Sequence, residues 1–480
     1  MTQHRWDGFA REAERDQGDV TTRFTYDPAG RLASQSVQRR ADGERVVERS
    51  YDRDVNGRLA CVHDLRHGDT RYVYDPAGQL VDAHGLSMER FVHDPAGNLL
   101  GAGNSVVEGN RLLVQGDRHF RYDAAGNLVE ERRGTGGRLV THYDYDGSHR
   151  LVAAHTPRGT TRYRYDALGR RIAKVSDERE TRFWWDGVAL LGEESTEGLN
   201  TSRRWYVYEP GTFRPLARID VASEATARPR LATVDGALTP PSKPGSQVYH
   251  YHVDHLGTPR EMTDADGRVV WSARYRAFGA LVVADVAEID NPLRFQGQYH
   301  DVETGLHYNF LRYCDPTTGR YLSQDPIGLE GGINAYRYVA DPVQWIDPLG
   351  LVGTCKDPDI VYRVIRPDED PAAGLTAKNP DANWSPTGHV NNGSRPGAAS
   401  QFISTTRDPA VAEKWSAATG NRIVSIDLSK VNGDMLDLST AAGRDTYLNG
   451  VMAKNFAGSS SEVLVKGSIP PEAISPYPGP

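Results

Sequence analysis

The sequence is poor in cysteine, which excludes two common ways of stabilising a protein. Its 480 residues include three cysteines, Cys61, Cys314 and Cys355, and no two of them are spaced as Cys-x-x-Cys. Disulfide frameworks and structural zinc sites need more cysteines at closer spacing. We therefore expect free thiols, synthesis in a reducing compartment and no metal site.

Long apolar runs are also missing. No stretch of about 18 consecutive apolar residues occurs, so we expect no membrane-spanning helix. The first residues, MTQHRWDGFAREAERDQ, lack the apolar core that a cleaved signal peptide requires. The formal net charge is −8 and the two signs are interleaved, which argues against an extended basic face for nucleic acid.

Glycine and tyrosine are plentiful, with 48 and 23 residues, and this favours strands joined by tight turns. A unit of the form aromatic-x-Tyr-Asp-x-x-Gly-x-Leu recurs at a spacing of roughly 20 to 29 residues. Alternating apolar residues before Tyr-Asp predict a strand, Asp, Pro and Gly predict a turn, and Leu begins the returning strand. Because a lone hairpin is marginally stable, the hairpins should pair edge to edge. The copies begin at Phe24, Arg49, Tyr72, Phe91, Phe120, Tyr143 and Tyr163.

This pattern resembles the YD repeats of rearrangement-hotspot (Rhs) proteins and of insecticidal toxin-complex C subunits, whose strands spiral into a hollow β-shell. The segment RFQGQYHDVETGLHYNFLRYCDPTTGRYLSQDPIGL is similar to the Rhs-associated core signature. The repeats are too few for a complete shell of that family, so a partial shell is expected. The resemblance implies a multidomain chain with an N-terminal segment (1–23), an all-β YD-repeat shell (24–247), an Rhs core (248–351) and a small α+β domain (352–480).

Two Asp-Pro-x-Gly-Leu boxes follow, beginning at Asp325 and Asp347. In the Rhs family the second box ends the constant core, and several members cut themselves after its final Leu. The resemblance implies a scissile bond between Leu351 and Val352, with Asp325 and Asp347 as an acid pair. Two close carboxyls do not both ionise, so one can activate water while the other protonates the leaving group. Asp-Pro-x-Gly is also an ordinary turn, so a purely structural role stays open.

Beyond residue 351 the repeats stop and helices and strands mix without βαβ regularity, which indicates an α+β domain. Strands are expected at 359–366, 401–406, 421–431 and 460–474, helices after Asp408 and over 444–458, and a long polar loop region over 367–400. The order Tyr-Arg-Val, Ser-Thr-Thr and Glu-Val-Leu-Val resembles the ADP-ribosyltransferase toxin fold of the Arg-Ser-Glu type.

The resemblance implies an NAD site and assigns roles within it. Arg363 would hold an NAD phosphate or ribose, since guanidinium is a planar phosphate clamp. Glu462 would grip the nicotinamide ribose, where a carboxylate stabilises an oxocarbenium-like charge. NAD would be the substrate, with no metal or second cofactor. Ser404, Thr405 and Thr406 would brace the cleft, and Trp415 and His389 are weaker candidates for the wall of the pocket.

Several alternatives remain open. The position two before Glu462 is Ser460, where the family usually has Glu or Gln, so the acceptor is undetermined and water would give an NAD glycohydrolase. A deaminase would need His-x-Glu and Pro-Cys-x-x-Cys, which are absent, and His389 is the one histidine after the second box, against a metal nuclease. A non-enzymatic surface or adhesion protein is the third alternative.

The resemblance also implies partners and a location. A cognate immunity protein, a secretion-machine spike or chaperone and a protein or nucleic-acid target would be the partners. The protein would be made in the bacterial cytoplasm, exported without a cleaved signal peptide and active in a target cell.

Overall fold

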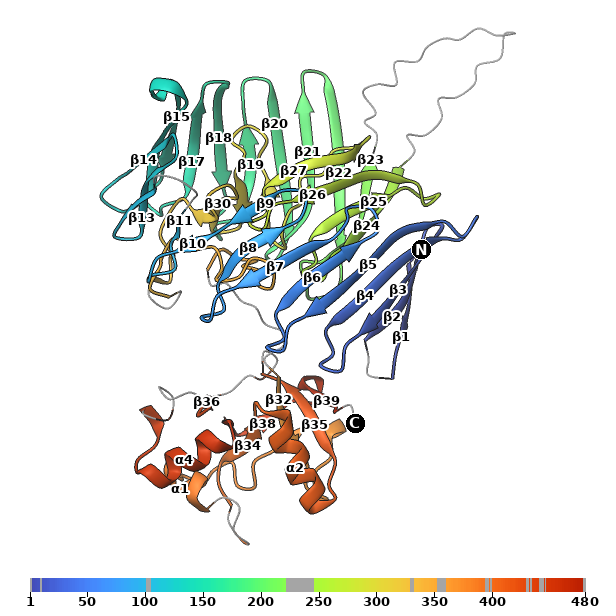
Figure 1. Ribbon diagram of the computed structural model, residues 1–480, viewed down its shortest axis with the longest axis vertical. Helices are drawn as coiled ribbons and strands as arrows, with labels where there is room; N and C mark the ends of the chain where they lie inside the picture. The colour runs from blue at the N-terminus through green and yellow to red at the C-terminus, as the bar shows by residue number, and fades with distance from the viewer. Residues whose placement is uncertain are drawn as a thin grey trace. The chain divides into compact units, whose positions relative to one another are not determined.

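A computed structural model of the protein (Figure 1) divides into two compact units. Unit 1 comprises Met1–Trp6 and Glu12–Cys355, and unit 2 comprises Asp7–Arg11 and Lys356–Pro480. Among the described helices, none is long and apolar enough to cross a membrane. The described residues are 2–8, 11–100, 105–221, 246–328, 332–351, 360–392, 397, 399–428, 431, 434–439, 444 and 446–477.

Two large antiparallel sheets make up most of unit 1, and in each sheet every strand pairs with its neighbours in the sequence (Figure 1). The nine-stranded sheet starts at Thr2, so residues 1–23, expected as a separate segment, already contribute strands. Its strands are β1 (Thr2–Trp6), β2 (Glu12–Gln17), β3 (Val20–Tyr26), β4 (Leu32–Arg39), β5 (Arg45–Arg53), β6 (Leu59–Asp64), β7 (Thr70–Tyr74), β8 (Leu80–His84) and β9 (Met88–Arg90).

The second sheet has sixteen strands and includes the region after residue 184, where the Tyr-Asp motif itself fades. Its strands are β12 (Ser105–Glu108), β13 (Arg111–Gln115), β14 (Arg118–Tyr122), β15 (Leu128–Arg133), β16 (Leu139–Tyr145), β17 (Leu151–Thr156), β18 (Gly159–Tyr165), β19 (Arg171–Val175), β20 (Arg179–Asp186), β21 (Ala189–Glu197), β22 (Asn200–Tyr208), β23 (Pro215–Val221), β24 (Ser246–Val253), β25 (Pro259–Thr263), β26 (Val269–Tyr275) and β27 (Leu281–Ala287).

The Tyr-Asp motif determines how consecutive hairpins join. In the first copy, Asp27 accepts a hydrogen bond from the backbone of Arg31 at 2.9 Å, and Gly30 adopts a φ of 81°, which closes the turn. The Tyr26 hydroxyl donates to the backbone oxygen of Glu12 at 2.8 Å, so the tyrosine ties its strand to the preceding hairpin. The tyrosine bond repeats at Tyr74, Tyr145 and Tyr165 and the aspartate bond at Asp54, Asp75, Asp94, Asp123, Asp146, Asp166, Asp254 and Asp264.

Residues after β27 pack against both large sheets and complete the core of unit 1. Val343 belongs to the same buried cluster as Tyr51 and Leu59 of the nine-stranded sheet, and Tyr299 meets Phe183 of β20 at 5.2 Å between ring centroids. Arg171 is fully buried among five aromatic rings and pairs with Asp301. The remaining short strands are β10 (Val92–His93), β11 (Leu99–Leu100), β28 (Tyr299–His300), β29 (His307–Asn309), β30 (Arg312–Asp315) and β31 (Arg320–Tyr321).

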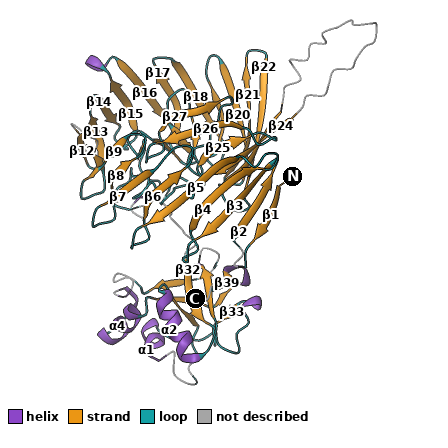
Figure 2. Cartoon of the chain, turned by 45° about the vertical axis from the view of Figure 1, so that its right-hand side comes forward, coloured by secondary structure: helices purple, strands orange, loops and turns teal. Residues whose placement is uncertain are grey.

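Unit 2 combines a six-stranded sheet, in the order β36-β37-β34-β32-β35-β39, with the longer helices of the chain (Figure 2). Strands β34 and β37 share five paired positions, whereas β32 and β34 share one, Tyr362 with Thr406, so the sheet opens at that seam. The elements are β32 (Ile360–Val364), β33 (Leu375–Thr376), α1 (Pro386–Asn392), β34 (Phe402–Thr406), α2 (Pro409–Thr419), β35 (Ile423–Asp427), β36 (Met435–Asp437), α4 (Val451–Ser459), β37 (Glu462–Lys466), β38 (Ser468–Ile469) and β39 (Ile474–Pro476).

One expectation for this unit was wrong. Residues 367–400 are not a polar loop throughout, because they include the short strand β33 and the helix α1. The reason lies in packing: α1 lies over a buried apolar cluster that contains Phe402 and Leu464, and its Val390 packs against that cluster. Polar composition hid the helix, since a single turn or two of helix needs few apolar residues to be held by tertiary contacts.

Candidate functional site

The first candidate site is formed by Arg312, Asp325, Asp347 and Leu351, which we name the hinge site. Arg312 lies on β30 with 1% of its side chain exposed, and its Nη2 is 2.9 Å from Asp325 Oδ2 and 3.4 Å from Asp347 Oδ2. The structure therefore brings the two predicted aspartates onto one buried guanidinium. Tyr321 completes this arrangement by donating to Asp347 Oδ2 at 2.8 Å.

The backbone around Leu351 is held against these groups. Asp347 Oδ1 accepts from the Leu351 amide at 3.0 Å, and Arg312 Nη2 donates to the Leu351 carbonyl at 3.2 Å. Gly350 has a φ of 68°, and a Cβ there would lie 2.6 Å from the backbone oxygen of Asn309, so glycine is required at this close approach. Val352 lies outside the described residues.

Electrostatics at the hinge site suit proton transfer. Burial raises the pKa of Asp347, against the opposing effect of Tyr321 and Arg312. Burial likewise raises the pKa of Asp325, against Arg312. A carboxyl with a raised pKa keeps its proton to a higher pH than an ordinary aspartic acid, which suits a group that protonates a leaving group. Arg312 already donates to the Leu351 carbonyl, so it could stabilise negative charge that develops on that oxygen.

The second candidate site joins four of the predicted residues of unit 2, Arg363, His389, Ser404 and Glu462, which we name the C-terminal cluster. Arg363 of β32 donates to the Ser404 backbone oxygen at 2.6 Å, across the seam where the sheet opens. His389 Nε2 lies 2.8 Å from Ser404 Oγ. Ser404 also interacts with the side chain of Glu462, the first residue of β37, and lowers the pKa of that carboxyl. Four elements thus meet at one serine.

The hydrogen bonds of the cluster can run in one direction, from Ser400 through His389 to Ser404. Ser400 Oγ lies 2.6 Å from His389 Nδ1, so the serine can donate there while His389 Nε2 donates to Ser404. Burial lowers the pKa of His389 to about 4, with a smaller contribution from Arg363, so the imidazole is neutral at pH 7. Burial raises the pKa of Glu462, which Ser404 opposes. The cluster can therefore orient a carboxyl with free acceptor capacity.

The other predicted residues are placed differently. Thr405 and Thr406 are fully buried, and their hydroxyls donate to the backbone oxygens of Val463 and Ser460 at 2.8 and 2.6 Å. These threonines therefore tie β34 to the neighbouring chain rather than face a ligand. Trp415 lies on α2 with 38% of its surface exposed, and the hydrogen bonds of the cluster do not pass through that helix.

Sequence reasoning missed the residues that hold the predicted ones in place. Arg312 and Tyr321 lie in the core signature, but nothing in their spacing pointed to Asp325 and Asp347. Glu369 pairs with Arg363 at 2.8 Å, and the acidic run after β32 was the available signal for that pair. An arginine expected to bind phosphate already has a carboxylate partner.

Comparisons with known proteins agree with the architecture of unit 1. The Teneurin YD-shell family matches residues 11–188, and the RHS protein family matches residues 248–285. These two segments of the chain are similar to the sequences of those families. Residues 358–476 match a domain of unknown function, DUF7587, so the NAD chemistry expected there stays a prediction.

Individual relatives extend the likeness. The double-stranded DNA deaminase toxin A of Burkholderia cenocepacia is 41% identical over 380 residues, which covers 72% of this chain and 26% of that protein. The probable deoxyribonuclease RhsA of Dickeya dadantii is 32% identical over 338 residues, covering 69% of this chain and 21% of that protein. The chain thus spans about a quarter of the length of these relatives. Together the matches show that about seven tenths of this chain is similar to part of each of these Rhs-type proteins.

Solved structures show the same fold. A Tc holotoxin pore of Photorhabdus luminescens aligns with a TM-score of 0.52 at 18% identity, covering 74% of this chain and 19% of that chain. At this identity the likeness concerns the fold alone, and it agrees with the paired hairpins of the Rhs/YD part.

Proposed function

We propose that this chain is an Rhs-type polymorphic toxin whose residues 352–480 use NAD to ADP-ribosylate a macromolecule of a target cell. The observation that carries the proposal is the C-terminal cluster, in which Arg363, His389, Ser404 and Glu462 come from four elements to one seam of the sheet. A cognate immunity protein and a delivery machine are the partners, and the protein acts after export to a target cell.

The charge at Glu462 supports this chemistry. Among the described residues Glu462 forms no ion pair, although its side chain is buried, because Arg363 pairs with Glu369 instead. Breaking the bond between nicotinamide and ribose builds positive charge on the ribose, and a buried carboxylate without a cation of its own stabilises that charge. Ser404 orients the carboxyl, and neutral His389 orients Ser404. Arg363 holds β32 to β34, which fixes the width of the seam.

The chemistry of the relatives is not transferred to this chain. One relative is called a DNA deaminase and another a probable deoxyribonuclease, although both match about seven tenths of this chain. Shared delivery sequence with differing activities fits a variable effector. A zinc deaminase needs three metal ligands from His and Cys, and residues 352–480 contain Cys355 and His389 alone of these types.

We also propose that the effector is released by cleavage between Leu351 and Val352. The hinge site supports this, because Asp347 and Arg312 bind the Leu351 amide and carbonyl, and Asp325 pairs with the same Arg312. In this proposal one aspartic acid protonates the leaving amine while the other, ionised, activates the attacking water.

The test of the transferase uses the whole chain, labelled NAD and a bacterial extract, with nicotinamide release and label transfer as separate readouts. Glu462→Gln should abolish both, by at least about 100-fold, since the carboxylate acts on the developing charge. The matched control is Glu413→Gln, because Glu413 is an acidic residue on α2 of the same unit that accepts a hydrogen bond from the Tyr477 hydroxyl. Its activity should equal that of the unaltered chain.

The readouts separate the alternatives. Label on protein or nucleic acid names the acceptor class. Nicotinamide release without transfer identifies an NAD glycohydrolase. If the folded chain leaves NAD intact in every bacterial extract, the assignment of the C-terminal cluster to NAD is contradicted. The chain would then have a binding or delivery role.

A further inference from the structure

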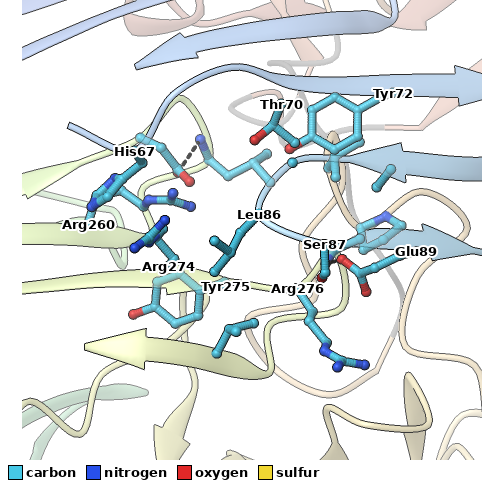
Figure 3. Close-up of a pocket in the computed structure, with 18 of the residues that line it drawn as sticks. His67, Thr70, Tyr72, Leu86, Ser87, Glu89, Arg260, Arg274, Tyr275 and Arg276 are labelled. Carbon is cyan, nitrogen blue, oxygen red and sulfur yellow. Dashed lines mark hydrogen bonds between the residues drawn. The ribbon is translucent and has the colours of Figure 1, made fainter. Parts of the chain in front are cut away.

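Three side chains of unit 1, all remote in sequence from both candidate sites, converge beside a pocket. They are Asp64 at the end of β6, His67 in the turn after it and Glu261 on β25, and we name them the cation triad. His67 belongs to the lining of the pocket, on the same side as Arg260 and Arg274 (Figure 3). The triad therefore joins the nine-stranded sheet to the sixteen-stranded sheet.

Contacts at its Nε2 atom orient the His67 ring. That nitrogen lies 3.0 Å from Ser272 Oγ and 3.3 Å from Asp285 Oδ2, which are acceptors for its proton. Arg274 holds Asp285 in place through an ion pair. A carboxylate on one imidazole nitrogen fixes the tautomer and leaves the other nitrogen with a free lone pair. The free atom here is Nδ1.

The His67 side chain is buried, with 4% of it exposed, yet its Nδ1 has no hydrogen-bond partner among the described residues. It lies 3.5 Å from Asp64 Oδ2 and 3.7 Å from Glu261 Oε1. A lone pair facing two carboxylate oxygens in a buried place is repulsive unless a positive charge lies between them. Ligands about 2.1 Å from a tetrahedral ion are about 3.4 Å apart, close to the separations found here.

The carboxylates of Asp64 and Glu261 are held in place by one arginine. Arg49, buried with 1% of its side chain exposed, donates to Asp64 at 2.7 Å and to Glu261 at 2.8 Å. Hydrogen bonds from outside the ligand set orient the ligands of natural metal sites in the same way.

We propose that Asp64, His67 and Glu261 bind one divalent transition-metal ion of the Zn²⁺ type and thereby pin the two large sheets of unit 1 together. One nitrogen and two oxygen ligands match the chemistry of such ions. The ion is structural, since the triad lies apart from the hinge site in the sequence and bridges two sheets. The sequence predicts no metal site on the ground that its cysteines are not clustered, and this triad uses no cysteine.

The test measures Zn²⁺ on the untagged full chain. After treatment with a chelator and dialysis against Zn²⁺, metal analysis should find one ion per chain, and calorimetry should give a dissociation constant in the micromolar range or below. His67→Gln should weaken binding more than about 100-fold, and Asp285→Asn about 10- to 100-fold. The matched control is His155→Gln, an exposed histidine that pairs with Asp144, which should leave binding unchanged.

A His63 variant and an X-ray absorption spectrum can contradict the proposal. A second group, Cys61, His63 and Asp69, also offers metal ligands at the surface, so loss of binding in His63→Gln rather than His67→Gln overturns the assignment. X-ray absorption at the zinc edge should show nitrogen and oxygen neighbours, and sulfur in that shell points to Cys61. Absence of stoichiometric Zn²⁺ from the folded unaltered chain overturns the proposal.

Discussion

Asp347 and Glu462 are both buried carboxyls whose pKa burial raises, yet their surroundings differ. Asp347 has a guanidinium from Arg312, a phenol from Tyr321 and the Leu351 amide within hydrogen-bonding or ion-pair range. Glu462 has the Ser404 hydroxyl and, among the described residues, no ion pair. One carboxyl is surrounded by partners from the chain itself, and the other retains unused acceptor capacity.

The difference reflects where each proposed substrate comes from. At the hinge site the peptide to be cut belongs to the chain, so the carbonyl of Leu351 is already bound by Arg312. At the C-terminal cluster the substrate would arrive from solution, and positive charge would develop on its ribose beside Glu462. A site that contains its substrate is complete in the unliganded protein, whereas a site for a diffusing substrate keeps one interaction free.

The largest expected effect is at the hinge site. Asp347→Asn and Asp325→Asn each keep the side-chain size but remove the titrating group, and we expect each to slow cleavage at Leu351 at least about 100-fold. The intact chain should then accumulate, as measured by mass spectrometry of freshly synthesised protein. The unaltered chain should yield fragments that end at Leu351 and begin at Val352.

A buried aspartate outside the site provides the control. Asp341 also begins an Asp-Pro turn, its pKa is raised by burial, and it hydrogen-bonds Gln344 and the Val343 amide. Asp341→Asn should therefore leave the cleavage rate unchanged in folded protein. Equal rates in Asp341→Asn and Asp347→Asn would mean that the aspartates act only as turn residues.

The next effect concerns the pH dependence of unit 2. His389 has a folded pKa of about 4, below its ordinary value of 6.5, so it contributes stability above pH 6.5 that is lost as the pH falls toward 4. The full loss is on the order of 3 kcal/mol, at about 1.36 kcal/mol for each pKa unit. Glu462 has the opposite slope, because its raised pKa stabilises the protonated form as the pH falls. His389→Gln should flatten the loss between pH 7 and pH 5.

Hydrogen exchange of peptides from β34 measures this effect within the full chain. Comparison of His389→Gln with the unaltered protein isolates the histidine, because Glu462 titrates in both. His155→Gln, an exposed histidine of unit 1, should leave the exchange of β34 unchanged. Identical pH slopes for β34 in the His389 variant and the unaltered chain would contradict the assigned pKa.

The comparison also separates what sequence could predict from what it could not. The Tyr-Asp hairpins were predictable because their chemistry is local: Asp27 bonds its own turn and Tyr26 bonds the preceding hairpin. Arg363, Ser404 and Glu462 could be chosen as a set by their order along the chain, and the structure brings them together. The set nevertheless omitted Glu369, whose pairing with Arg363 depends on how the chain turns after β32.

Contacts between residues far apart in the sequence could not be predicted, and the reason is physical. Arg312 meets Asp325 and Asp347 only because β30 and two turns fold onto one another. His67 and Glu261 likewise meet only after two sheets are assembled. Periodicity and local motifs report on neighbours in sequence, whereas these contacts follow from tertiary packing, and polar residues scattered along the chain carry no mark of it.

The smallest expected effect tests the boundary of the C-terminal cluster. Trp415 was a predicted wall of the NAD pocket, but it lies on α2 with 38% of its surface exposed, while the cluster is built from α1, β32, β34 and β37. We therefore expect Trp415→Ala to leave NAD consumption within about twofold, whereas Ser404→Ala, which removes the hydroxyl that orients Glu462, should reduce it about tenfold or more. Steady-state rates on the full chain measure both. A loss in Trp415→Ala as large as in Ser404→Ala would mean that NAD extends over α2, and Glu462 would then be one edge of a wider site rather than its centre.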